Sequence, residues 1–262
     1  MSLNETPAED VTPAPGRIRV GVGGWTFAPW RDNFYPRGLP HKQELGWASR
    51  RLSAIEVNGT FYSSFKPASF ARWREETPDD FVFSLKAHRF TTHRKRLATA
   101  AEPVMRFVNS GISELGPKLG PIVWQFMPTQ AFDPVDFEAF LALLPHSVDG
   151  LPLRHVLDVR HPSFAAPEYL ALARRHRSVT VHTDAANFPD IRDAEGEFAY
   201  LRLMRSESGL ATGYPAAALG QWAQGARAWA GGARPRDVYI YFINGAKERA
   251  PAAALDLLHR LA

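Results

Sequence analysis

Side chains that can do chemistry recur at the ends of a series of short apolar segments. In chain order they are Glu56, Asn58, Lys86, Gln125, Asp158, Arg160, His161, Asp184, Arg202 and Asn244. Carboxylates and imidazoles transfer protons, whereas lysine and arginine bind phosphate and carboxylate groups. The set therefore predicts acid–base chemistry on an anionic substrate.

In this interpretation two carboxylates and one imidazole are the candidates for proton transfer. We expect Glu56 or Asp158 to be the general base and His161 to carry a proton. The expected substrate is a phosphorylated sugar or a nucleotide-like compound. The reaction type stays open between hydrolysis, isomerisation and lyase chemistry.

The cations Lys86, Arg160 and Arg202 are expected to bind and polarise the anion. A basic stretch, residues 88–96, contains His93 and is either a solvated loop or a clamp on the anion. If burial lowered the pKa of Lys86, its amine could instead form a Schiff base with a carbonyl group.

A metal-assisted hydrolase, including one that cleaves phosphoesters, is the enzyme alternative. Its candidate Zn or Mn ligands are Glu56, Asp158, His161, His182 and Asp184. No compact His-x-x-x-His spacing supports a metal, and the neighbouring cations oppose one. No cofactor is predicted, and a divalent metal stays an open alternative.

Aromatic and amide side chains extend the predicted site, and two interpretations other than catalysis stay open. Trp25 and Tyr62 either line a substrate pocket or pack loops, and Asn58, Gln125 and Asn244 would contact the substrate. The charged groups could instead form an ion network with a purely structural role. Alternatively, the protein could be a barrel that binds a ligand in the same pocket without catalysing a reaction. A catalytic group differs from a binding group in having a pKa displaced toward the working pH.

Eight short segments rich in β-branched and aromatic residues position these groups. They span residues 18–23, 54–58, 81–86, 121–126, 155–160, 178–182, 198–203 and 237–242. Helical patterns are expected near residues 41–51, 67–76, 101–115, 136–144, 166–176, 215–230 and 251–261, with loop over 184–197. The alternation predicts an α/β fold, a closed parallel (β/α)8 TIM-like barrel in one domain, residues 17–262. An open doubly wound sheet would carry a glycine-rich phosphate turn whose spacing Gly21–Gly24 lacks.

Composition narrows the class of protein. The 262 residues are 45% hydrophobic and 22% charged, contain no cysteine and carry a formal net charge of +4. These values exclude a disulfide scaffold and a coiled coil, and they do not indicate a nucleic-acid binder. No apolar run reaches membrane-span length, so we expect no membrane contact and a cytoplasmic location. Residues 1–16 are expected to form a disordered leader.

The order of several motifs resembles one known family. The motifs are Gly23-Gly24-Trp25, Glu56-Val57-Asn58-Gly59-Thr60-Phe61-Tyr62, Arg160-His161 and Tyr200-Leu201-Arg202. On these motifs the chain is identified as a member of domain of unknown function 72, a TIM-barrel family, over about residues 18–262. The resemblance implies the barrel but no activity. The family's recurring residues correspond here to Glu56, Asn58, Lys86, His93, Gln125, Asp158, Arg160, His161 and Arg202.

The chain departs from the family pattern at four places. Asp158 stands where the family usually has Glu, and Phe164 where Trp is commoner. Met204-Arg205 replaces a common His-Gly pair, and Ile243-Asn244 replaces a pair of Asn residues. If those residues are catalytic in relatives, the resemblance implies an altered activity here.

Overall fold

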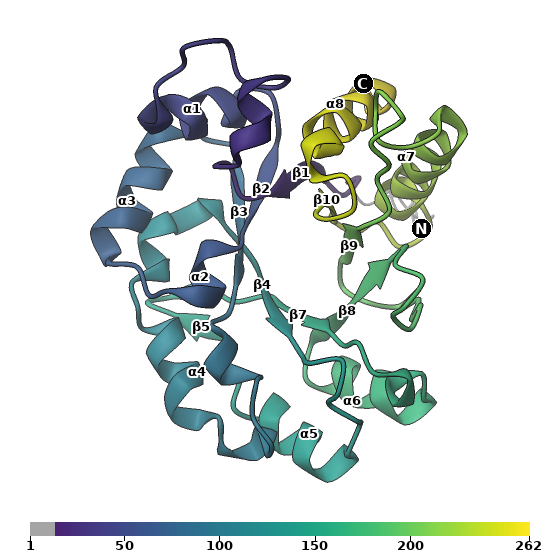
Figure 1. The fold of residues 1–262 in the computed structure, drawn as a ribbon. Helices are drawn as coiled ribbons and strands as arrows, with labels where there is room; N and C mark the ends of the chain where they lie inside the picture. Colours follow the sequence, from purple (N-terminus) through teal and green to yellow (C-terminus); the bar gives the residue numbers. More distant parts are fainter. Residues whose placement is uncertain (1–13) are drawn as a thin grey trace, which may run out of the picture.

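Eight parallel strands close into a barrel in the computed structural model, which describes residues 14–262 (Figure 1). The strands are β1 (Ile18–Gly23), β2 (Ala54–Val57), β3 (Val82–Lys86), β4 (Leu119–Gln125), β7 (His155–Asp158), β8 (Ser178–Thr183), β9 (Ala199–Leu203) and β10 (Val238–Phe242). Their order around the barrel is β1-β10-β9-β8-β7-β4-β3-β2, and every neighbouring pair is parallel. The predicted TIM-like barrel is therefore confirmed.

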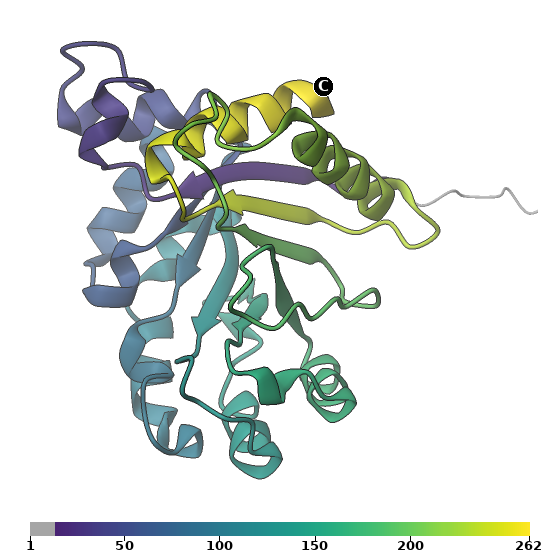
Figure 2. The same cartoon turned by 45° about the vertical axis from the view of Figure 1, so that its right-hand side comes forward.

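Helices follow most strands and lie outside the barrel (Figure 2). They are α1 (Glu44–Ser49), α2 (Gly59–Tyr62), α3 (Pro67–Glu76), α4 (Ala101–Val108), α5 (Pro134–Leu141), α6 (Pro167–Arg175), α7 (Ala216–Gly231) and α8 (Ala250–Leu261). Short 3₁₀ turns add η1 (Ala28–Arg31), η2 (His41–Gln43), η3 (Arg89–Thr91), η4 (Leu97–Thr99), η5 (Ile112–Lys118), η6 (Pro162–Phe164) and η7 (Lys247–Arg249). The connection from β8 to β9 contains no helix, as the sequence predicts for residues 184–197.

The first turns of the helices show why they begin where they do. Pro67, Pro134 and Pro167 each lie in the first turn of a helix. Proline suits this place because its φ is already helical and its missing N–H would be unpaired there. Asp133 also caps α5 by accepting hydrogen bonds from the N–H groups of Val135 and Asp136.

Alternation along each strand separates two buried layers. Outward side chains such as Ile55 and Trp124 belong to the large core between strands and helices. Inward side chains such as Val123, Val181 and Tyr241 fill the barrel itself. Because both faces are apolar over most of their length, the inward polar groups at the strand ends stand out as a separate feature.

Three local features differ from expectation. The helix expected over residues 101–115 ends at Val108, because Gly111 adopts a φ of 96° and starts η5. A hairpin of β5 (Ser147–Val148) and β6 (Leu151–Pro152) precedes β7, and its turn uses Asp149 and Gly150 at φ 47° and 78°. Of the expected disordered leader, residues 1–13 lie outside the described residues. Gly16 is already tied to the fold, since its N–H donates to the Ala230 carbonyl.

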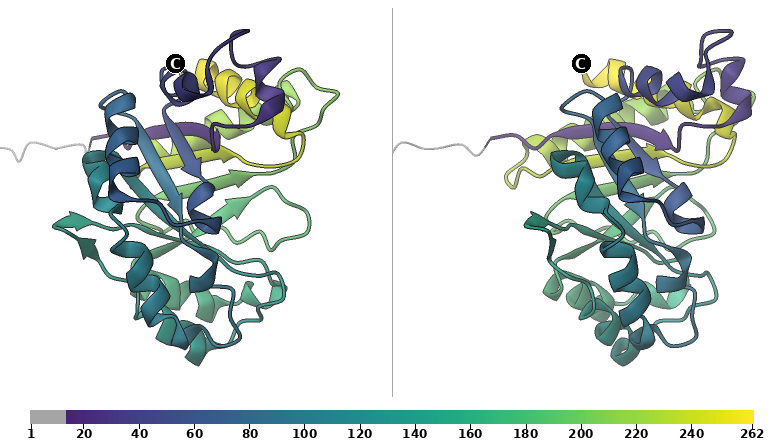
Figure 3. Two further views of the ribbon diagram at one scale, coloured as in Figure 1. Left: turned by 60° about the vertical axis from the view of Figure 1, so that its left-hand side comes forward. Right: turned by 90° about the vertical axis from the view of Figure 1, so that its left-hand side faces the viewer.

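The strands all run in one direction, so their C-terminal ends meet at one end of the barrel (Figure 3). That end carries the loops after β1, β2, β3 and β7. Within residues 14–262, none of the helices has the length and hydrophobicity needed to cross a lipid bilayer.

Candidate functional site

Inward-facing polar side chains gather at the C-terminal end of the barrel. They come from five strands: Glu56 from β2, Lys86 from β3, Gln125 from β4, Asp158 from β7 and Arg202 from β9. The parallel register sets Gln125 beside Asp158. Hydrogen bonds link four of these side chains, Glu56, Gln125, Asp158 and Arg202.

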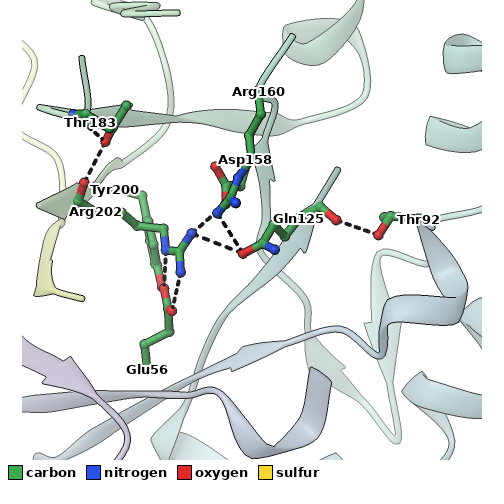
Figure 4. Close-up of polar contacts among 9 residues, drawn as sticks. Glu56, Thr92, Gln125, Asp158, Arg160, Thr183, Tyr200 and Arg202 are labelled. Carbon is green, nitrogen blue, oxygen red and sulfur yellow. Dashed lines mark hydrogen bonds and ion pairs between the residues drawn. The ribbon is translucent and has the colours of Figure 1, made fainter. Parts of the chain in front are cut away.

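Arg202 is the centre of this cluster (Figure 4). Its Nε and Nη2 atoms each donate a 3.0 Å hydrogen bond to the carboxylate of Glu56, and its Nη1 donates at 2.5 Å to Asp158 Oδ2. The Tyr200 hydroxyl also donates to Glu56, at 2.9 Å. Arg202 is 1% exposed and Glu56 is fully buried, so this ion pair lies inside the protein, away from solvent.

Arg160 pairs with the same carboxylate, Asp158, and is only partly buried. Its Nη2 donates to Asp158 Oδ2 at 2.9 Å and to Gln125 Oε1 at 2.8 Å. The guanidinium stacks 4.6 Å from the ring centroid of Phe188, which belongs to the loop between β8 and β9. That loop therefore holds one wall of the site, a role its sequence alone does not indicate.

The charges of the cluster fix its protonation. Burial would raise the pKa of Asp158, but attraction to Arg202 and Arg160 and the Arg160 hydrogen bonds outweigh it and hold the pKa below its ordinary value. Burial alone would lower the pKa of Arg202, and attraction to Glu56 and Asp158 raises it instead. Asp158 is therefore a carboxylate and Arg202 a cation at neutral pH.

Lys86 differs from its neighbours because its amine is unpaired. The side chain is 4% exposed, and within residues 14–262 its Nζ makes no hydrogen bond or ion pair. The nitrogen lies 4.2 Å from the ring centroid of Phe61. Burial and then repulsion by Arg202 lower the pKa of Lys86 to about 8. The amine is thus partly neutral at physiological pH.

His93 is a second unpaired group beside Lys86. Its ring centroid is 5.2 Å from that of Phe61, and its Nε2 is buried with no hydrogen-bond partner in the described part of the chain. Burial and the charges of Arg89, Lys86 and Arg160 lower its pKa, so the imidazole is neutral at pH 7. The preceding Thr92 hydroxyl donates to the Gln125 carbonyl at 2.6 Å, which fixes the basic stretch against the end of β4.

Several sequence-predicted residues do not join this cluster. His161 Nδ1 pairs with the hydroxyl and N–H of Ser163 and caps η6. Asn244 is exposed, and its backbone carbonyl accepts from the Ser206 hydroxyl. Asp184 accepts from the Met204 N–H and the Tyr214 hydroxyl.

His182, one of the candidate metal ligands, does not face the barrel interior. Its ring lies 5.5 Å from Trp222 and 5.9 Å from Trp229, both on α7, so it faces the helical layer. Val179 and Val181 are the residues of β8 that fill the barrel.

A cavity of about 320 Å³ lies at the ends of β1 and β2. Trp25 and Asn58 line it together with Gly23, which is the register partner of Glu56. Lys247 closes another side, with its Nζ 4.8 Å from the ring centroid of Phe27. Tyr62 instead projects outward, 63% exposed, with its ring edge against Phe61.

The candidate metal ligands do not converge. In the part of the chain that the structure describes, no group of three or more His, Cys, Asp or Glu side chains could hold a metal ion. Glu56 and Asp158 are engaged by arginines, while His161 and His182 point to different surroundings.

Two relatives are similar in sequence over part of their length. The UPF0759 protein YecE of Escherichia coli (strain K12) is 31% identical over 151 residues, covering 57% of this chain and 50% of YecE. The UPF0759 protein YunF of Bacillus subtilis (strain 168) is 25% identical over 158 residues, covering 58% and 54%. The chain thus spans about half the length of the relatives that it matches.

Solved structures agree on the fold. A DUF72 family protein (TM1631) from Thermotoga maritima MSB8 superposes with a TM-score of 0.71 at 21% identity, covering 92% of this chain and 97% of that one. The family model described as "Protein of unknown function DUF72" matches residues 19–262. The barrel, its ordered motifs and this match together show that the chain belongs to the DUF72 family.

Proposed function

We propose that the chain is an enzyme that binds a small anionic substrate at the C-terminal end of the barrel. One observation carries the proposal: in the part of the chain that the structure describes, three cations, Lys86, Arg160 and Arg202, face two carboxylates, Glu56 and Asp158. Burying a charge without a partner is costly, and a bound anion would offset that cost. A network serving stability alone would gain nothing from the extra cation.

The atoms left without partners define where the substrate would bind. Within residues 14–262, no hydrogen bond is made by Lys86 Nζ, Arg160 Nη1, Asp158 Oδ1 or His93 Nε2. They supply two cationic donors, a carboxylate oxygen and an imidazole nitrogen. A phosphate or carboxylate group fits the donors, and a proton-transfer step fits the other two.

The roles follow from what each side chain already binds. We assign proton transfer to Asp158 and His93 rather than to Glu56 and His161. Glu56 has both oxygens engaged by Arg202, and His161 is held by Ser163. We assign Glu56 and Arg202 to positioning Asp158. The pKa of Lys86 is displaced toward neutral pH, which favours catalysis over ligand binding alone, because a binding group needs no such displacement. The pKa values of Asp158 and His93 are lowered away from neutral pH, so these groups can serve as proton acceptors, one as a carboxylate and the other as a neutral imidazole.

Thermal melting at fixed ionic strength tests the proposal, with inorganic phosphate and ribose 5-phosphate as probes. A ligand at about 100 times its Kd adds roughly 2.7 kcal/mol to the free energy of unfolding, which is a rise in Tm on the order of 5–10 °C. We expect Arg160→Ala to abolish the rise. Arg174→Ala is the matched control, because Arg174 pairs with Asp193 and Glu195 away from the cluster. If neither anion raises Tm in the unmodified protein, the proposal is wrong.

A further inference from the structure

We propose that Lys86 is a covalent nucleophile that forms an imine with a small carbonyl compound bearing a carboxylate or phosphate group. This inference rests on the proposed function, because Arg160 of the same anion site would hold the charged end of the substrate while Lys86 reacts with its carbonyl group. It adds the chemical class of the reacting group and the atom that attacks it.

A comparison with the other buried lysine shows what is unusual about Lys86. Lys118 is equally buried, 4% exposed, but its ammonium donates to the carbonyls of Arg74 and Thr77 at 2.6 and 2.7 Å. Burial lowers the pKa of Lys118 as well, but its ammonium has hydrogen-bond acceptors within the fold, as expected of a structural lysine. Among residues 14–262, Lys86 Nζ has no such acceptor, and it lies 4.2 Å from the ring centroid of Phe61. A structural hydrogen bond within the described residues therefore does not explain why Lys86 is buried.

The surroundings of Lys86 favour the neutral amine that an addition to a carbonyl requires. Desolvation and the neighbouring guanidinium of Arg202 oppose protonation, and Arg160 adds to that repulsion. Glu56 and Asp158 would favour the ammonium, but both are hydrogen-bonded to Arg202. A lysine that is desolvated beside another cation is a recognised way to activate an amine nucleophile.

The reaction balances with groups that the site contains. The amine lone pair attacks the carbonyl carbon, and the carbonyl oxygen takes up a proton to give a carbinolamine. The C–O bond then breaks as the nitrogen lone pair forms the C=N bond, and the oxygen leaves as water. Both amine hydrogens end on that water, so no oxidant or reductant is needed. Asp158 Oδ1 and His93 Nε2 are the uncommitted atoms that can move these protons.

Reductive trapping tests the inference on the full chain. The protein is incubated with sodium cyanoborohydride and either pyruvate, a keto acid, or dihydroxyacetone phosphate, a phosphorylated ketone. Peptide mapping then locates the reduced adduct. At pH 7 we expect Lys86 to react roughly tenfold or more faster than exposed Lys66, because its lowered pKa leaves more neutral amine. The probe that reacts faster distinguishes a carboxylate from a phosphate substrate.

Controls separate this inference from the proposed function. Lys86→Arg lacks the amine, so it should lose the adduct. Lys66→Arg, at an exposed residue outside the cluster, should keep both the adduct at Lys86 and the phosphate-induced rise in Tm. Lys118 should stay unlabelled in every protein. If the anions still raise Tm but neither probe labels Lys86 faster than Lys66, the covalent role is wrong and the anion site stands. If no anion raises Tm and no adduct forms, both proposals fail.

Discussion

At the scale of single residues, Lys86 is where stability and the proposed chemistry oppose each other. Its folded pKa of about 8 lies below its ordinary 10.5, so between these values the unfolded chain binds more protons. The buried ammonium is therefore destabilising at pH 7, and wild-type stability rises as the pH passes from 8 toward 10.5. We expect Lys86→Met to raise the free energy of unfolding by about 1–3 kcal/mol at pH 7, measured by urea denaturation.

The pH dependence makes this prediction specific. Since Lys86→Met leaves two guanidiniums facing two carboxylates, its advantage should shrink above pH 8 as the wild-type amine loses its proton. Lys118→Met is the matched control. It should lower the free energy of unfolding, because it removes the ammonium that donates hydrogen bonds to the carbonyls of Arg74 and Thr77. A Lys86→Met variant that is less stable than wild type at pH 7 would refute the argument.

Part of the cluster could be predicted from the alternation of side chains along the strands. Alternation along β2, β7 and β9 was enough to predict that Glu56, Asp158 and Arg202 share the barrel interior. His182 lies on the outer face of β8, where two tryptophans on α7 contact its ring, so it is not available as a ligand in the barrel interior. The pattern also could not separate Arg202, whose guanidinium is bound by two carboxylates, from Arg160, whose Nη1 has no hydrogen bond within the described residues 14–262.

At the scale of elements, β1 reaches β2 only because Gly21 has no side chain. Gly21 pairs with Ala54, and an added Cβ would lie 1.8 Å from the Ala54 carbonyl oxygen. The clash involves backbone, so it cannot be relieved by rotating a side chain. We expect Gly21→Ala to lower the free energy of unfolding by about 3 kcal/mol or more in urea denaturation.

A second glycine supplies the control for this effect. At Gly231, the last residue of α7, an added Cβ would have no atom of the described residues within 4 Å. Its replacement by alanine should change stability by no more than about 1 kcal/mol, in the stabilising direction. Equal effects of the two substitutions would show that the close approach of β1 and β2 does not limit stability.

Most elements were predictable from the chain, and the exceptions have local causes. Short β-branched segments and helices with proline in their first turn follow directly from residue types, as at Pro67 and Pro134. The β5–β6 hairpin was missed although Asp149-Gly150 is a hairpin turn signal, because its strands are only two residues long. The position of Phe188 over Arg160 is set by tertiary packing of a loop that has no periodicity.

At the scale of the whole molecule, the cluster connects strands that are not neighbours. Glu56 on β2 and Asp158 on β7 are joined through Arg202 on β9, although neither strand is adjacent to β9 in the barrel. The two ion pairs therefore connect strands from different sides of the closed barrel. Removing one partner leaves a buried charge uncompensated, which typically costs about 3–5 kcal/mol.

Acid should open the barrel through Asp158. Arg202 and Arg160 hold its folded pKa below the unfolded value despite burial, so its contribution is present above the unfolded pKa and is lost as the pH falls through the folded pKa. We expect Asp158→Asn to be about 3–5 kcal/mol less stable than wild type at pH 7, with the difference narrowing below about pH 4. Urea denaturation across this pH range measures both. Asp80→Asn, which alters an exposed pair with Arg19, should keep the wild-type acid profile to within about 1 kcal/mol. Parallel stability curves for wild type and Asp158→Asn down to the lowest pH would show that the cluster does not govern acid unfolding.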